Sequence, residues 1–358
     1  MIAIERQQLW ERLQAAGLAS GELPAADTDR SPWYVRVMLG IAGWMGALFL
    51  LGFVGVGFAV VMKNAGASIL VGALVCGGAA LMLRAGPKND FLSQMGLAVS
   101  LAGQVMLTYG FSRIFGESRL SIALIVAVQQ AVLFWLVPSV VHRVLSAWGG
   151  AVAATIAMSD LGLSPLAPAA VSAAFVAVWM NEFRFERSGS VLRAGGWGLA
   201  CATLQTCVLF GPMWLVWIGA RGHREWPGEF LGWVGAAASG AVLFAAALML
   251  LRREGLAMGS PQGRVALAGA AILAAVSLKA PGVGPAVAVL VVGYANGNRV
   301  LAGLGIAALV GYLSHYYYAL QVTLLEKSAL LAAAGVALLA LRFAMRIWWP
   351  KAEEANHA

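Results

Sequence analysis

The sequence predicts an all-α, polytopic transmembrane helix bundle with about twelve spans, ten being possible, and both termini in the cytoplasm. Composition is the first reason: 61% of the 358 residues are hydrophobic and only 11% are charged. Soluble domains carry about 45–50% apolar and about 25% charged residues. The second reason is that apolar runs of about 20 residues, the length that crosses a bilayer, recur along the whole chain. The third is that most Lys and Arg residues fall at every second break between these runs.

The spans are bounded by charges, by Gly/Pro clusters and by polar turns. In chain order they are Val37–Val61, Gly66–Leu83, Phe91–Phe111, Leu120–Val137, Val141–Ser159, Pro165–Asn181, Val191–Phe210, Phe230–Leu251, Gly263–Leu278, Val283–Tyr294, Val300–Ala319 and Ser328–Met345. The ninth and tenth are short and flank the Pro/Gly-rich segment 279–285. They form either two tight spans or one pair that enters the membrane and returns.

Three regions follow from this division: a cytoplasmic amphipathic arm (1–32), the transmembrane bundle (33–346) and a cytoplasmic tail (347–358). In the arm, residues 4–16 predict a short helix with Leu9, Trp10 and Leu13 on one side, and Gly17 is a plausible stop. The arm has no apolar stretch of the kind found in a cleavable signal peptide. Twelve spans of about 20 residues leave only short connections, so we expect no folded domain outside the membrane.

The charge distribution predicts the orientation. Lys and Arg remain on the cytoplasmic side of a membrane. Most of the 24 Lys and Arg residues lie on the same side as the N-terminus if twelve spans are assumed, among them Arg84, Arg143 and Arg252. This bias accounts for the net charge of +8 without a nucleic-acid partner, because the basic residues form no contiguous patch.

Small residues at four-residue spacing suggest where helices approach closely, since close backbone contact drives helix association in lipid. The candidate packing glycines are Gly232, Gly240, Gly293, Gly297, Gly303 and Gly311. Gly is frequent in membrane helices in any case, so each pattern alone is weak.

Known catalytic motifs are missing from the sequence. It contains no HExxH zinc motif, no GxSxG elbow and no phosphate-binding loop, and the four histidines have no spacing that suggests paired haem ligands. The three cysteines (Cys76, Cys201 and Cys207) lie singly within predicted spans, as small apolar core residues do. We therefore expect no metal site, no cofactor and no catalytic residue.

Two ionisable residues at span ends are candidates for a solute or ion path. Asp160 ends the fifth span and Lys279 ends the ninth, and each is followed by two prolines at the start of the next helix. Interrupted helices of this kind mark binding sites in secondary transporters, which suggests an Asp160–Lys279 ion pair. The simpler interpretation is that proline starts each helix and that both charges lie in hydrated headgroups.

A third candidate lies near the C-terminal end, where an aromatic cluster precedes an acidic residue. His315, Tyr316, Tyr317 and Tyr318 cover about half of the helix circumference, so some of the tyrosine hydroxyls should turn inward and need partners. Glu326 lies on the stripe of His315. It is either a carboxylate linked to protons or ligand near that histidine, or an interfacial residue beside Lys327.

Two segments resemble a known family. The first span is preceded by Ser31-Pro32-Trp33-Tyr34-Val35-Arg36 and runs on through a glycine-rich stretch at 40–53, and the second segment contains Tyr316-Tyr317-Tyr318 and Leu324-Leu325-Glu326-Lys327-Ser328. Together they resemble an uncharacterised bacterial membrane family, domain of unknown function 4401. The resemblance implies an inner-membrane protein, often accompanied by a small membrane partner with a GDYXXLXY motif, which this chain lacks. It implies no activity, substrate or catalytic residue.

Three functions are compatible with these observations. The first is a secondary transporter or permease for a small solute, which short loops, Gly/Pro breaks and a few buried ionisable groups favour. The second is a non-catalytic membrane subunit or scaffold for a partner membrane protein, which sparse polar groups favour. The third is an intramembrane enzyme acting on lipid, for which only His315, Tyr316 and Glu326 are candidates.

Overall fold

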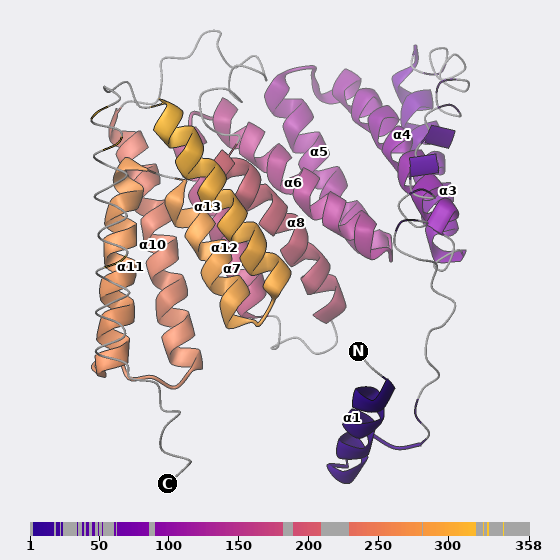
Figure 1. Cartoon of the computed structure of the whole chain (residues 1–358). Helices are drawn as coiled ribbons and strands as arrows, with labels where there is room; N and C mark the ends of the chain where they lie inside the picture. The colour runs from indigo at the N-terminus through magenta and orange to yellow at the C-terminus, as the bar shows by residue number, and fades with distance from the viewer. Residues whose placement is uncertain are drawn as a thin grey trace.

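The computed structural model describes residues 3–17, 63–85, 90–181, 189–208, 229–280 and 282–319, together with isolated positions elsewhere. All regular elements in these residues are helical (Figure 1). They are α1 (Ala3–Ala15), α3 (Ala65–Ala85), α4 (Asp90–Phe115), α5 (Arg119–Leu136), α6 (Val140–Asp160), the 3-10 turn η1 (Ser164–Leu166), α7 (Ala167–Met180), α8 (Gly189–Val208), α10 (Glu229–Arg253), α11 (Pro261–Lys279), α12 (Val283–Ala295) and α13 (Arg299–Ala319).

Six described helices are long and apolar enough to cross a membrane: α3, α4, α5, α6, α10 and α11. Shorter apolar helices cover 164–180, 283–295 and 299–314. Ten of the twelve expected spans coincide with a described helix, whereas those at 37–61 and 328–345 lie almost entirely outside the described residues. The protein is therefore an all-helical membrane protein.

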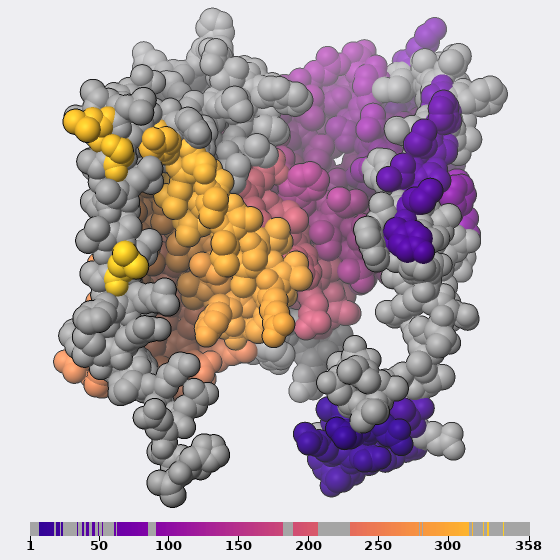
Figure 2. All heavy atoms as spheres, in the orientation of Figure 1, coloured from indigo at the N-terminus to yellow at the C-terminus, as the bar shows by residue number. Residues whose placement is uncertain are grey.

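The expected N-terminal helix is present as α1, and Gly17 follows it with a φ of 69°. Such a positive φ is accessible to glycine without steric strain and ends the helix. Figures 1 and 2 show α1, in indigo, standing apart from the other described helices.

Helices α3 and α4 form an antiparallel hairpin that packs along a seam of small residues. On α4 the seam consists of Gly96, Gly103 and Gly110, spaced by seven residues, and on α3 of Ala65, Gly72 and Ala79, with the same spacing. A Cβ added to Gly103 would lie 2.6 Å from the Cys76 Sγ and 2.9 Å from the Gly72 carbonyl oxygen. The two backbones therefore touch, as expected where close packing holds helices together in lipid.

The largest apolar core lies where α7, α8, α10, α12 and α13 meet. Helix α12 is its centre, and Ala286, Val289 and Val292 are all fully buried. A helix that is apolar on all sides belongs in the interior of a bundle. With 13 residues it is about 20 Å long, which is shorter than the hydrocarbon core of about 30 Å.

The two proline-led helix starts pack against the same helix, α10. Pro165 of η1 lies against Gly235, which leaves no room for a side chain at that position. One turn further along α10, the Ser239 carbonyl oxygen lies 3.3 Å from the position of a Cβ on Gly284, at the start of α12. The similarity seen in the sequence thus corresponds to spatial proximity of the segments that follow Asp160 and Lys279.

The candidate packing glycines differ in their surroundings. A Cβ on Gly240 would lie 3.0 Å from the Ala274 Cβ of α11, and one on Gly293 would lie 2.5 Å from the Ala302 backbone nitrogen of α13. At Gly232, Gly303 and Gly311 it would meet no described atom within 4 Å. Gly297 lies beyond the end of α12 with a φ of 63°, so Gly293 and Gly297 do not share one helix face.

Candidate functional site

Polar side chains gather between α4, α5 and α6, the three magenta and purple helices labelled in Figure 1. Ser100, Gln104 and Thr108 are spaced by four residues, so they lie on one face of α4. Ser100 and Gln104 are buried. In a candidate membrane span, buried polar groups need partners from neighbouring helices, because neither lipid nor water supplies them.

His142 of α6 provides the main link to α4. It lies in the first turn of the helix, where its backbone N–H donates to the N-cap hydroxyl of Ser139. The imidazole is 3% exposed. Its Nε2 lies 2.9 Å from the Ser100 Oγ, and its Nδ1 lies 3.2 Å from the Ser146 Oγ one turn further along α6. Both ring nitrogens are therefore hydrogen-bonded, one across helices and one within α6.

The direction of the two histidine hydrogen bonds depends on the imidazole tautomer. The Gln104 side-chain N–H donates to the Ser100 Oγ at 3.1 Å, which leaves that hydroxyl able either to donate to the His142 Nε2 or to accept from it. With the hydrogen on Nδ1, the imidazole accepts from Ser100 and donates to Ser146; with the hydrogen on Nε2, both roles are reversed. Both tautomers satisfy all three residues.

Two adjacent glutamines of α5 extend the network. The Gln130 side-chain N–H donates to the Gln104 Oε1 at 2.8 Å, and that of Gln129 donates to the Gln104 backbone carbonyl at 3.2 Å. Thr108 in turn donates to the Gln129 Oε1 at 3.2 Å. Gln104 is thus the centre of a hydrogen-bonded set, the α4–α6 network, which joins three helices and consists of Ser100, Gln104, Thr108, Gln129, Gln130, His142 and Ser146.

A small cavity of about 30 Å³ borders this network. A buried water needs about 10–15 Å³ and two to four polar partners, so one or two waters fit. The polar wall consists of Gln104, Gln130, His142 and Ser146, and the apolar wall of Leu97, Leu101 and Leu145.

Charged residues lie beyond both ends of the network. At one end, Arg84 and Arg143 donate to the carbonyls of Leu136 and Phe134, both at 3.1 Å. They thereby satisfy the last carbonyl groups of α5, which arginines near a helix C-terminus commonly do.

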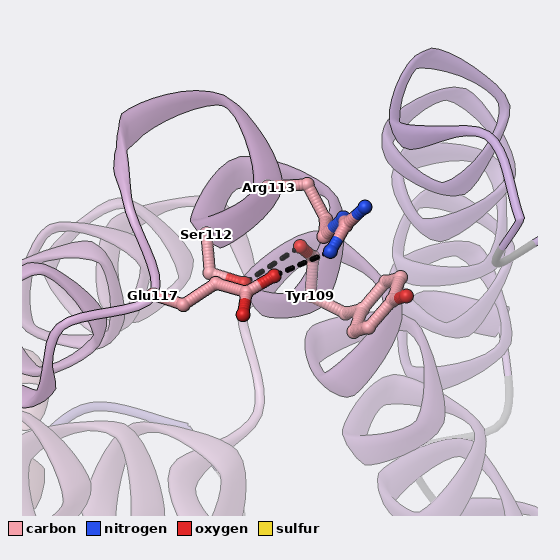
Figure 3. Close-up of polar contacts among 4 residues, drawn as sticks. All are labelled: Tyr109, Ser112, Arg113 and Glu117. Carbon is pink, nitrogen blue, oxygen red and sulfur yellow. Dashed lines mark hydrogen bonds and ion pairs between the residues drawn. The ribbon is translucent and has the colours of Figure 1, made fainter.

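At the opposite end, Arg113 forms an ion pair with Glu117 at 2.6 Å (Figure 3). In the same view the Tyr109 ring points away from this pair, while its carbonyl accepts from the Ser112 hydroxyl.

The structure places Asp160 in a different ion pair from the one the sequence suggests. Its Oδ1 lies 3.3 Å from the Arg119 Nε at the start of α5. Lys279 ends α11, but its side chain lies outside the described atoms. The suggested Asp160–Lys279 pair therefore stays a prediction.

The aromatic candidates lie at the end of α13. The backbones of His315, Tyr316, Tyr317 and Tyr318 are helical, and of their side chains only that of Tyr317, which is half-buried, is described. Glu326 lies outside the described residues, so the proposed proximity of His315 and Glu326 also stays a prediction.

Sequence reasoning missed the α4–α6 network. The site residues predicted from the sequence are charged or aromatic, whereas the network is built from hydroxyl and amide groups around one buried histidine. The available signal was the polar spacing of four in α4 together with the Gln129-Gln130 pair inside an apolar run. Within the described residues no three His, Cys, Asp or Glu side chains gather as metal ligands would.

These features define an integral membrane protein of packed helices with a polar interior site. Over residues 32–346 the chain matches the family described as Domain of unknown function (DUF4401), and it belongs to that family. No curated protein and no solved structure matches the chain.

Proposed function

We propose that this protein is a secondary transporter that carries a small solute through the membrane between α4 and the α5–α6 hairpin. The observation that carries the proposal is the α4–α6 network around its cavity. Leaving a buried polar group unsatisfied costs about 1–3 kcal/mol. Polar groups inside transmembrane segments tend to mark solute or ion pathways.

The packing of the hairpins supports this path. The α3–α4 hairpin is joined by touching backbones, whereas side-chain hydrogen bonds connect α4 to α5 and α6. Hydrogen bonds of this kind can exchange for bonds to water or solute at little net free energy. The α3–α4 hairpin can then rock as a rigid unit and expose the cavity to one side at a time, as in alternating access.

The proposal includes a finer architecture: twelve spans, both termini in the cytoplasm, in the inner membrane of a bacterium. Arg84 and Arg143, at one end of α5, would then face the cytoplasm, and Glu117 and Asp160 the outside. Asp160, Lys279, Glu326 and the aromatic cluster at 315–318 are further candidates for the solute path.

The test is uptake into proteoliposomes of a panel of labelled small solutes, by wild type and by two glutamine variants. Gln104→Leu removes the centre of the network. Gln205→Leu is the matched control, since Gln205 is a membrane-helix glutamine that accepts from the Trp148 indole N–H and does not line the cavity. We expect uptake by wild type and by Gln205→Leu, and its loss in Gln104→Leu. Uptake that survives Gln104→Leu would contradict the proposed path.

The second candidate is a non-catalytic subunit that holds a partner membrane protein, such as the small GDYXXLXY type. The observation that favours it is the water-sized cavity beside a tightly packed hairpin, an arrangement that a rigid scaffold would share. Purification in mild detergent with mass-spectrometric stoichiometry separates the two functions. A stoichiometric partner, with no uptake by the isolated chain, would favour the subunit.

A further inference from the structure

The cavity-lining groups retain unused hydrogen-bonding capacity. Among the described residues, Gln130 uses one side-chain N–H, on Gln104, which leaves its second N–H and its Oε1. Ser146 shares one hydrogen bond with the His142 Nδ1, so its hydroxyl can form a second one with a guest. Gln104 keeps its second N–H. The polar wall therefore offers both donors and an acceptor to a guest.

The described lining offers no carboxylate, ammonium or guanidinium group to such a guest. Among the residues that the structure describes, no Asp, Glu, Lys or Arg lines the cavity, and the buried His142 has two serine hydroxyls as its partners. Arg84 and Arg143 donate to carbonyls at the end of α5. The Cys76 thiol of α3 is also engaged, since it donates to the backbone carbonyl of Ser100. A charged guest would lose its hydration without gaining a counter-charge, which costs far more than burying a neutral polar group.

The opposite wall suits the carbon part of a guest. Leu97 is 3% exposed, and it lines the cavity together with Leu101 and Leu145. Small-molecule sites are commonly built in this way, with apolar walls and a few convergent polar groups that fix the orientation.

We infer that this cavity is a binding site for an uncharged molecule, about the size of the one or two waters that fit it, that both donates and accepts hydrogen bonds, such as formamide or methanol. Water occupies the site in the resting protein. The guest donates to the Gln130 Oε1 and forms a second hydrogen bond with the Ser146 hydroxyl, and its carbon atom contacts the leucine wall. The inference deepens the proposed function by naming the class of solute. Binding itself does not require that the solute be transported.

The experiment uses the full chain in lipid nanodiscs and three probes of equal size, each with three heavy atoms: formamide, the formate anion and the formamidinium cation. Saturation-transfer NMR measures their binding. Gln130→Leu removes the partner on the polar wall. Gln205→Leu is the matched control, because Gln205 bonds to Trp148 and belongs neither to the α4–α6 network nor to the cavity lining.

We expect formamide to bind wild type and Gln205→Leu, and to bind Gln130→Leu about tenfold more weakly, as for the loss of one hydrogen bond. Formate and formamidinium should not bind. Ser146→Ala, which removes one hydroxyl from the polar wall without adding bulk, should weaken formamide binding by a similar factor and covers the case in which Gln130→Leu fails to fold. Equal binding of all three probes, or formamide binding unaffected by Ser146→Ala, would overturn the inference.

Uptake measurements on the same variants separate this inference from the proposed function. If formamide binds in a Gln130-dependent way but is not taken up by the reconstituted protein, the site stands and the transporter proposal fails. If a charged solute is transported and formamide does not bind, the transporter proposal stands and the inferred solute class is wrong.

Discussion

At the scale of single residues, the most informative side chain is that of His142, because its two ring nitrogens bond to different helices. Nε2 meets Ser100 of α4 and Nδ1 meets Ser146 of α6 itself. The two amide side chains can each imitate one half of this arrangement. Glutamine places its polar end near the Nε2 position and asparagine near the Nδ1 position.

We therefore expect His142→Gln to preserve the bond between α4 and α6 and His142→Asn to lose it. The asparagine variant should be less stable than the glutamine variant by about 1–2 kcal/mol, because the buried Ser100 hydroxyl would lose its hydrogen bond to residue 142 and keep only the one from Gln104. Titration with SDS, followed by tryptophan fluorescence, measures both free energies of unfolding. Equal stabilities would show that the Ser100 bond contributes nothing to helix association.

The limits of sequence-based prediction are also clearest at this scale. The bond between Ser100 and His142 joins residues 42 positions apart, and no local pattern encodes that distance. Asp160 stands out in the sequence because burying a charge is costly, whereas its ion pair with Arg119, 41 positions earlier, has no local signal. Burying a neutral glutamine costs less than burying a charge, so Gln104, Gln129 and Gln130 do not stand out in the sequence. Their hydrogen bonds become evident only when α4, α5 and α6 are packed against one another.

At the scale of helices, the seven-residue seam of α3 and α4 determines how closely the hairpin packs. We expect Gly103→Leu to destabilise the protein by about 1–3 kcal/mol, as overpacking does, because the new side chain would collide with the α3 backbone at Gly72 and Cys76. Gly77→Leu is the matched control, since a Cβ there meets no described atom within 4 Å. Thermal unfolding in detergent compares the two; a stable Gly103→Leu protein would mean that the hairpin can separate without loss.

The positions of the helices could be predicted more fully than their contacts with neighbouring helices. The length of an apolar run, and the charge or proline that ends it, are local properties of the sequence, so the expected spans from 66–83 to 300–319 each coincide with a helix. Which glycines touch a neighbour depends on the partner helix. Gly103 lies in the seam and Gly232 meets no described atom, although both lie in apolar runs.

At the scale of the whole molecule, the proposed orientation predicts opposite accessibility for two exposed turns. Glu117 lies between α4 and α5, and Glu254 lies between α10 and α11. In a background with Cys76, Cys201 and Cys207 replaced by alanine, Glu117→Cys should react with a membrane-impermeant maleimide in intact cells. Glu254→Cys should react only after permeabilisation. The reverse pattern would place the termini outside, and equal labelling of both in intact cells would contradict the assumed number of spans between them.

The burial of α12 also bears on how the protein is made. Helix α12 packs against α7, α8 and α10, which are synthesised before it, and against α13, which is synthesised after it. It therefore cannot reach its final surroundings when it leaves the ribosome. At that moment the face that later receives Ala302 is still uncovered. The enclosure of α12 is therefore complete only when α13 arrives, and a chain interrupted near residue 298 would present this uncovered face to the quality-control proteases of the membrane.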